Sequence, residues 1–146
     1  SERILHGDPP TRGEIELARE WTRRETNAVV SAMQGYQSAT SVGTAGTITA
    51  LAAMAQKLPA YEPARIHNYR LTLATVQELE QTLLSRRKAD RVGLPGLEKN
   101  REDVIAAGAI ILRTVMESLG MSSVLVSDLG LREGVLLHLA GEMKEG

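Results

Sequence analysis

The stretch SVGTAGTITALAAM, residues 41–54, decides the fold because it joins a β-favouring run to an alanine-rich helical run through two glycines. Residues 36–42, YQSATSV, favour an extended strand, since β-branched side chains prefer that conformation. The helix predicted to follow covers residues 47–58 and ends at Pro59. A glycine-containing turn between a strand and a helix is a common ligand-binding position in open α/β sheets, so the stretch predicts an α/β fold with a candidate site at the turn.

The turn itself, GTAGT at residues 43–47, is either an ordinary strand-to-helix turn or a binding site for an anion. Gly43 and Gly46 can adopt positive φ and let a ligand approach the backbone, and a helix starting near Thr47 presents unpaired N–H groups. The hydroxyls of Thr44, Thr47 and Thr49 would add donors for phosphate oxygens. The pattern matches neither GxGxxG nor the lysine-containing phosphate loop, so the residues alone leave both interpretations open.

An amphipathic helix is predicted over residues 14–33, opened by a capping box of Thr11 and Glu14. At about 100° per residue its apolar side chains fall on one side, which indicates a face packed on a core. These side chains are Ile15, Leu17, Ala18, Trp21, Ala28, Val29, Ala32 and Met33. Glu25 falls within this apolar face. A carboxylate in such a place is either an ion-pair partner in the interior, a group at the edge of the face, or a functional group.

The middle of the chain combines a connection, a helix and a basic segment. Residues 59–70 carry two prolines and are predicted to form a long connection. A second amphipathic helix is predicted to begin after Thr72. RRKADR at residues 86–91 places four basic residues in six positions, the strongest local positive charge in the chain. Such a run is typical of a solvated face.

A third helix is predicted over residues 101–119, with Asn100 and Asp103 as a capping pattern and Gly120 as its stop. Residues 104–112, VIAAGAIIL, are apolar around the whole circumference of such a helix. We therefore expect this helix to be the central and most buried one.

The last strand and helix complete the predicted fold. SSVLVSD at residues 122–128 predicts a parallel strand covered on both faces, and residues 130–143 predict a closing helix. The two predicted strands would pair in parallel through helical crossovers. Because a two-stranded parallel sheet leaves long unpaired edges, the chain is interpreted as part of something larger.

The composition is that of an ordinary globular domain and argues against several classes of function. The net charge of −1, from 17 basic and 18 acidic residues, provides no field that would attract nucleic acid or an anionic membrane. The absence of cysteine excludes disulfides and thiolate chemistry and fits a reducing cytoplasm. The first residues show no signal-peptide pattern, and no apolar run could span a bilayer, so a cytoplasmic location is expected. His6, His67 and His138 show no metal spacing.

Five segments resemble, in order, the exopolyphosphatase and guanosine pentaphosphate phosphohydrolase (Ppx/GppA) family. They are RILHGDPPT (3–11), VGTAGTITALAAM (42–54), HNYRLTLATV (67–76), LPGLEKNREDVIAAGAIIL (94–112) and VSDLGLREGVLL (126–137). The resemblance implies an actin-like, ribonuclease-H-like ATPase fold in two lobes, of which residues 1–146 would be a helix-rich α/β fragment with few parallel strands. This fragment would be part of the second lobe, without the first lobe and without the opening strands of the second.

The family resemblance also implies a reaction and a set of site residues. The family's members release the terminal phosphate of polyphosphate, or the 5′ phosphate of guanosine pentaphosphate, usually with Mg²⁺. The residues that match its phosphate or nucleotide site are Gly43, Thr44, Ala45, Gly46, Thr47 and Arg101. Its general-base glutamate and two other phosphate loops have no counterpart here, so the chain would contain no catalytic residue and no Mg²⁺ ligand and would be inactive alone.

Other interpretations remain at this stage. Arg101 could instead form an ion pair with Asp103, and Asp128, Gly130, Arg132 and Glu133 in the family signature SDLGLREG are interpreted mainly as a turn and a helix cap. A non-enzymatic nucleotide-sensing or interaction module that retained one lobe is the alternative function, and a sugar or acetate kinase of the same fold superfamily is a third. The expected partners are polyphosphate or guanosine penta- or tetraphosphate, the first lobe, and a second copy in a homodimer.

Overall fold

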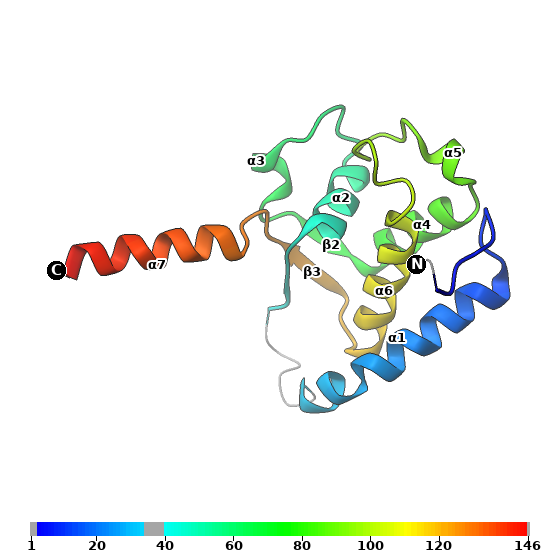
Figure 1. Ribbon diagram of the computed structural model, residues 1–146, viewed down its shortest axis with the longest axis horizontal. Coiled ribbons are helices and arrows are strands. Elements are labelled where there is room, and N and C mark those ends of the chain that lie inside the picture. Colours follow the sequence, from blue (N-terminus) through cyan, green and yellow to red (C-terminus); the bar gives the residue numbers. More distant parts are fainter. Residues whose placement is uncertain (1–2, 34–39, 146) are drawn as a thin grey trace.

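A short mixed sheet and a set of helices make up the chain, described in a computed structural model over residues 3–33 and 40–145 (Figure 1). The elements in order are α1 (Arg12–Met33), β1 (Val42–Gly43), α2 (Gly46–Ala55), α3 (Pro63–Ile66), β2 (Arg70–Thr72), α4 (Leu73–Leu84), α5 (Lys88–Arg91), α6 (Ile105–Ser118), β3 (Ser123–Val126) and α7 (Leu131–Glu145). In Figure 1, α2, α4 and α6 lie together beside the sheet, α1 runs along α6, and α7 projects away from the other helices.

The sheet has the order β1-β3-β2 among the described residues. β1 pairs in parallel with β3, as predicted, and Gly43 lies opposite Val126. β2 pairs antiparallel with β3, and Leu71 lies opposite Val124. The sheet therefore has one strand more than predicted, because the predicted connection 59–70 contains α3 and the first residue of an additional antiparallel strand.

The two predicted strands are shorter than expected. Of the strand expected at 36–42, residues 36–39 lie outside the described residues, and β1 covers Val42–Gly43. β3 covers Ser123–Val126 and alternates, with Val124 and Val126 buried and Leu125 only half-buried. The expectation that this strand is covered on both faces is therefore wrong, since one face packs on the core and the other is partly open.

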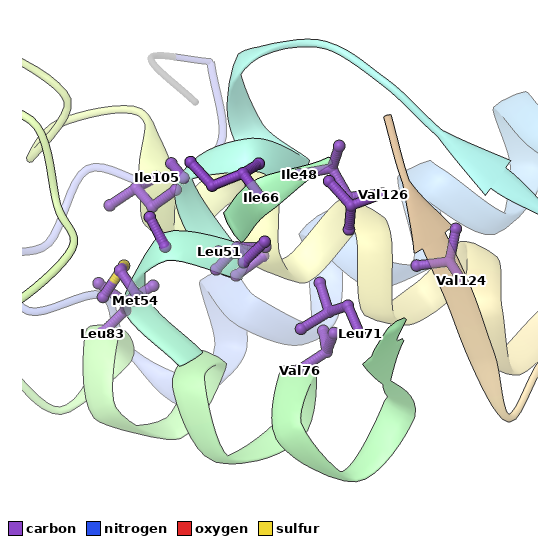
Figure 2. Close-up of a cluster of buried hydrophobic side chains, with 14 of the residues drawn as sticks. Ile48, Leu51, Met54, Ile66, Leu71, Val76, Leu83, Ile105, Val124 and Val126 are labelled. Carbon is purple, nitrogen blue, oxygen red and sulfur yellow. The ribbon is translucent and has the colours of Figure 1, made fainter. Parts of the chain in front are cut away.

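Helix α2 forms the centre of the hydrophobic core. Seven consecutive residues of this helix, from Ile48 to Met54, are buried. Figure 2 shows side chains of α2 packed among residues of α4, α6 and the sheet, including Leu71, Val76 and Ile105. α6 packs against α1, α2 and α4 and is central as predicted, but Ile111 on it is 44% exposed. The most completely buried helix is thus α2, not α6.

The start of α6 also differs from its prediction. The helix begins at Ile105 after Val104, without a side-chain cap, because Asn100 has a left-handed backbone with φ 69° and Asp103 forms an ion pair with Lys88. The predicted capping role of Asn100 and Asp103 is therefore wrong. The predicted stop is confirmed, since Gly120 follows the helix with φ 65°.

Helix α1 is capped as predicted but oriented differently. The Glu14 carboxylate accepts hydrogen bonds from the Thr11 N–H and hydroxyl, and Thr11 Oγ1 accepts from the Glu14 N–H. Most of the predicted core-facing side is exposed, including Leu17 at 53% and Trp21 at 44%. The prediction of an apolar face laid on the core is therefore wrong for this chain, in which Thr22 is the residue of α1 that is buried.

Charged contacts fix α1 to the rest of the fold. Arg19 of α1 donates two hydrogen bonds of 3.0 Å to the buried Glu80 carboxylate of α4, which also accepts one from Arg113 of α6. Glu25 is exposed and pairs with Arg24 at 3.5 Å, as a carboxylate on the surface. The interpretation of Glu25 as an ion-pair partner is thus confirmed, and the pair lies at the surface, not in the interior. No helix of the described residues is long and apolar enough to cross a membrane.

Candidate functional site

Two turns meet at the carboxyl ends of the parallel strands β1 and β3. The Ser127 N–H donates to the Gly43 carbonyl at 2.7 Å, which continues the sheet pairing past the strands. The Thr44 hydroxyl then donates to the Leu129 carbonyl at 3.0 Å. The turn that precedes α2 and the turn that precedes α7 therefore form one edge of the molecule, at the place where open α/β sheets bind ligands.

The amino end of α2 has no side chain that caps it. Its N-cap residue is Ala45, whose methyl group offers no acceptor, and no side-chain capping hydrogen bond is formed. The first N–H groups of a helix have no partner within the helix, and they lie at the positive end of its dipole. An oxyanion at this end would accept those hydrogen bonds.

Ala45 also holds a backbone conformation that is unfavourable for a residue with a side chain. Its φ is 77° and its ψ is 170°. Non-glycine residues in such sparsely populated regions are concentrated at ligand clamps and active sites. Ala45 is exposed, as is Thr44, so this part of the bend is open to solvent.

Arg101 places a positive charge beside the same helix end. A Cβ on Gly46 would lie 2.3 Å from Arg101 Nη1 and 2.9 Å from Nη2, so the guanidinium lies directly over the first residue of α2. Arg101 Nε donates to Glu98 at 2.8 Å, whereas Nη1 and Nη2 make no hydrogen bond within the described chain. We call the amino end of α2, residues 45–48, together with Arg101 the anion seat.

The electrostatics of the anion seat favour a negatively charged ligand. A guanidinium and the positive end of a helix dipole repel each other in the absence of an anion between or beside them. The Arg101 side chain is 36% exposed, so a ligand from solvent can reach it. Arg101 pairs with Glu98 and not with Asp103, so the predicted ion pair with Asp103 is wrong.

The two glycines of the turn act differently from the prediction. Neither Gly43 nor Gly46 has positive φ, and the left-handed conformation falls on Ala45 instead. A Cβ on Gly43 would lie 2.0 Å from Ile48 Cδ1, so this glycine allows close packing of the strand on α2. Gly46 provides the space that Arg101 fills. The expectation that both glycines take positive φ is therefore wrong.

The threonine hydroxyls are largely engaged inside the protein. Thr44 donates to Leu129, and Thr49 donates back to the Gly46 carbonyl at 3.2 Å. The side chain of Thr47 packs against α6, because a Cβ on Gly108 would lie 2.5 Å from Thr47 Cγ2. The donors that face a ligand are therefore backbone amides and Arg101, in place of the predicted hydroxyls.

The second turn contains contacts that no local sequence signal indicates. The Tyr61 hydroxyl donates to the Asp128 carboxylate, and the Asp128 N–H donates to His67 Nδ1 at 3.4 Å. Burial, together with the bond to Asp128, raises the pKa of Tyr61. Glu133 accepts from the Gly130 N–H at 2.7 Å, which lowers the pKa of Glu133. The interpretation of this segment as a turn and cap thus holds for Gly130 and Glu133.

A pocket of about 500 Å³ lies between residues 57–61, which follow α2, and residues 93–98. Its lining is mainly apolar, with Lys57 and Glu98 as its charged members. Glu98 also binds Arg101, and Tyr61 also binds Asp128. Two residues that line the pocket, Glu98 and Tyr61, therefore connect it to the anion seat and to the second turn by hydrogen bonds.

The fold and the site are thus those of an α/β protein in which an uncapped helix end and an arginine lie beside the carboxyl ends of two parallel strands. The Ppx/GppA phosphatase family model matches residues 1–143, so the chain belongs to the Ppx/GppA phosphatase family. Exopolyphosphatase 2 of Mycobacterium tuberculosis is 36% identical over 145 residues, which are 97% of this chain and 46% of that protein. Guanosine-5'-triphosphate,3'-diphosphate pyrophosphatase of Aeromonas hydrophila is 34% identical over 102 residues, which are 70% of this chain and 19% of that protein.

Solved structures of Ppx/GppA proteins have the same fold as this chain. A Ppx/GppA enzyme of Aquifex aeolicus superposes with a TM-score of 0.84 at 31% identity, over 94% of this chain and 44% of that one. An exopolyphosphatase of Cytophaga hutchinsonii superposes with a TM-score of 0.80 at 20% identity, over 94% and 45%. The chain therefore has a helix-rich part of the actin-like ATPase fold. It spans less than half the length of these relatives.

Proposed function

We propose that this chain is the phosphate-binding part of a phosphohydrolase that releases the terminal phosphate of polyphosphate or the 5′ phosphate of guanosine pentaphosphate. Family membership supports the reaction class. The single structural observation that supports the site is the uncapped amino end of α2 beside the Arg101 guanidinium. Both features attract a phosphate oxygen.

In the proposed reaction a water oxygen bonds to the terminal phosphorus while the bridging P–O bond breaks. The backbone N–H groups at the start of α2 and the guanidinium of Arg101 hold oxygens of the phosphate chain and stabilise their charge. The general base that takes the proton from the water is expected outside this chain. The chain alone therefore binds a phosphate chain but does not hydrolyse it.

Mg²⁺ is an expected cofactor of the whole protein. Among the described residues there is no group of three or more His, Cys, Asp or Glu that could hold a metal ion. Near the anion seat, Asp128 is bound by Tyr61 and Glu98 by Arg101. Bound Mg²⁺ would neutralise charge on the phosphate oxygens, and we place its ligands in the rest of the protein.

The missing partner of this chain is a first lobe, together with the strands that open the second lobe. Helix α7 supports this, since its side chains are exposed on several sides, with Leu131 at 85%, Leu136 at 66% and Leu137 at 73%. A helix that is apolar on several sides is normally buried. The sheet supports it too, because within residues 3–33 and 40–145 β1 pairs with β3 alone, and its Val42 is 61% exposed. A lobe packed on α7 would also face the second turn, which leads directly into that helix.

Phosphate release by the whole protein tests this proposal. The full-length protein should release phosphate from polyphosphate or guanosine pentaphosphate, and Arg101→Ala should reduce that rate at limiting substrate by about tenfold or more. Arg132→Ala is the control, because this exposed arginine lies in another of the family-like segments and outside the anion seat. A full-length protein that binds guanosine pentaphosphate without releasing phosphate would support the non-enzymatic sensing module instead.

A further inference from the structure

The basic segment 86–91 has an internal role that its composition does not suggest. Arg86, Arg87 and Lys88 are exposed, as expected for a solvated face, but Arg91 is only 4% exposed. For Arg91 the prediction of a solvated residue is therefore wrong. A buried arginine of this kind is retained only where its donors are satisfied.

Three backbone carbonyls satisfy the Arg91 guanidinium. Nε donates to Leu83 at the end of α4, Nη2 donates to Arg86, and Nη1 donates to Glu102, each at 2.9 Å. The planar fork of arginine is needed for this, because it presents several donors in fixed directions at once. Arg91 thus joins the end of α4 to the segment that precedes α6.

That segment carries the charged group of the anion seat. Glu102, whose carbonyl Arg91 binds, is adjacent to Arg101 in the chain. The Arg101 carbonyl accepts the N–H groups of Val104 and Ile105 and so starts the turn into α6. The segment has no side-chain cap on α6 to fix it, so the bond from Arg91 is its buried side-chain anchor.

A second contact from the same short helix is at the surface. Lys88 lies 3.6 Å from the Asp103 carboxylate, and both side chains are more than half exposed. Exposed pairs of this kind contribute little to stability. The position of residues 101–103 therefore depends more on the buried Arg91 than on Lys88.

We propose that Arg91 is a positioning residue for the anion seat, which holds the Glu102 carbonyl and thereby keeps the Arg101 guanidinium over the first residue of α2. The inference rests on the proposed function, because it requires that Arg101 binds the ligand's phosphate. It assigns the basic segment an indirect role: its buried member orients the arginine that contacts the anion and does not contact the anion itself.

A double-mutant cycle on the full-length protein tests this, with tripolyphosphate as the probe and calorimetry in the absence of Mg²⁺ as the measurement. Arg91→Lys keeps the charge but replaces the fork by one ammonium, so it should weaken binding by about 3- to 10-fold. In an Arg101→Ala background the same change should have less than about a 2-fold effect, because the group that it positions is gone. Arg113→Lys is the matched control, since this arginine binds Glu80 and Glu117 and not the segment before α6.

A second readout separates positioning from general destabilisation. Hydrogen exchange of the Val104 and Ile105 amides should accelerate in Arg91→Lys but not in Arg113→Lys, and it can be measured where both variants are folded. Equal losses of affinity from Arg91→Lys with and without Arg101 would overturn the inference, as would unchanged binding by Arg91→Lys. If Arg101→Ala alone leaves binding unchanged, the anion seat itself is refuted, which distinguishes failure of the proposed function from failure of this inference.

Discussion

The guanidinium of Arg101 occupies the space that a side chain on Gly46 would fill, with Nη1 at 2.3 Å from the position of an added Cβ. These residues are far apart in the sequence and belong to the loop before α6 and the first turn of α2. The contact places a cation at a helix end that is already positive. The contact explains why position 46 is a glycine. In the proposed anion seat, Gly46 and Arg101 are therefore expected to act together, because a side chain at position 46 would displace the guanidinium.

Gly46→Ala should displace the guanidinium and weaken anion binding while leaving the fold intact. The three atoms nearest to the added methyl group belong to the far end of the flexible Arg101 side chain, so the free energy of unfolding should change by less than about 1 kcal/mol. Affinity for tripolyphosphate, measured by calorimetry, should fall by about 5- to 10-fold, towards that of Arg101→Ala. Gly13→Ala is the control, because nothing lies within 4 Å of a Cβ there. If Gly46→Ala bound tripolyphosphate with wild-type affinity, the space at Gly46 would not be needed for anion binding.

Alanine substitutions of Gly96 and Gly93 test how the loop that lines the pocket packs on α2. Both have positive φ, 83° and 76°, but a Cβ on Gly96 would lie 2.3 Å from the Ala53 carbonyl carbon, whereas one on Gly93 would meet nothing within 4 Å. Gly93→Ala should cost about 1 kcal/mol for the backbone conformation alone. Gly96→Ala should cost about 3 kcal/mol or more, because backbone atoms of α2 must also move. Equal costs in denaturant unfolding would show that the loop does not pack on α2 as described.

Glu80 is expected to hold α1 on the other helices. Its side chain is 1% exposed and lies between Arg19 and Arg113, which are 16% and 25% exposed. Glu80→Gln would remove the buried charge that two partly buried arginines share and leave each with only its more exposed partner, Glu16 or Glu117, so it should cost about 3 kcal/mol of unfolding free energy. Hydrogen exchange along α1 should increase in the same variant. The exposed partner Glu16 gives the control, because Glu16→Gln should cost less than about 0.5 kcal/mol.

The capping carboxylate of Glu14 should make stability depend on pH in acid. Hydrogen bonds from the Thr11 N–H, the Thr11 hydroxyl and the His6 and Gly7 N–H groups lower the pKa of Glu14 from 4.5 to about 2. Because the folded-state pKa is the lower one, its stabilisation is complete above about pH 4.5 and is lost as the pH falls towards 2. The difference in melting temperature between wild type and Glu14→Gln should therefore shrink over this range. A constant difference between pH 6 and pH 2 would contradict the capping role.

Features of the fold that depend on neighbouring residues could be predicted from the sequence. The capping box of Thr11 and Glu14 opens α1, Thr72 caps α4 by accepting from Thr75, and Gly120 ends α6. Each is a contact within a few residues, so its pattern is visible in the chain. The strand β2 could not be found in this way, because its three residues become a strand only by pairing with β3, some fifty residues later.

The candidate site was predicted in position but not in detail. The sequence pattern indicated the turn at residues 43–47, and the family resemblance added Arg101. The pattern did not indicate the contact between Arg101 and Gly46, which depends on the path of the loop before α6. It also did not indicate the positive φ of Ala45, since glycine is the usual residue in that conformation. Tyr61 was missed because it lies in a connection, and its partner Asp128 is distant in the chain.

The exposed apolar side of α1 shows a different limit of sequence patterns. Periodicity correctly indicated a helix with an apolar side, which includes Leu17 and Trp21. It could not indicate what covers that side, and in this chain α1 attaches through Arg19 and Glu80 instead. A hydrophobic pattern reports that burial is favourable, but not which part of a protein provides it.

The most direct test of the account is a titration of the ¹⁵N-labelled 146-residue chain with tripolyphosphate, followed through its backbone amide resonances. We expect saturable shifts that are largest for Gly46, Thr47 and Ile48, accompanied by the Arg101 side-chain resonance, and strongly reduced in Arg101→Ala. The same shifts should weaken with added salt, since the interaction is partly electrostatic. Shifts absent from these amides, or spread evenly over exposed basic residues such as Arg86 and Arg87, would contradict an anion seat at the amino end of α2.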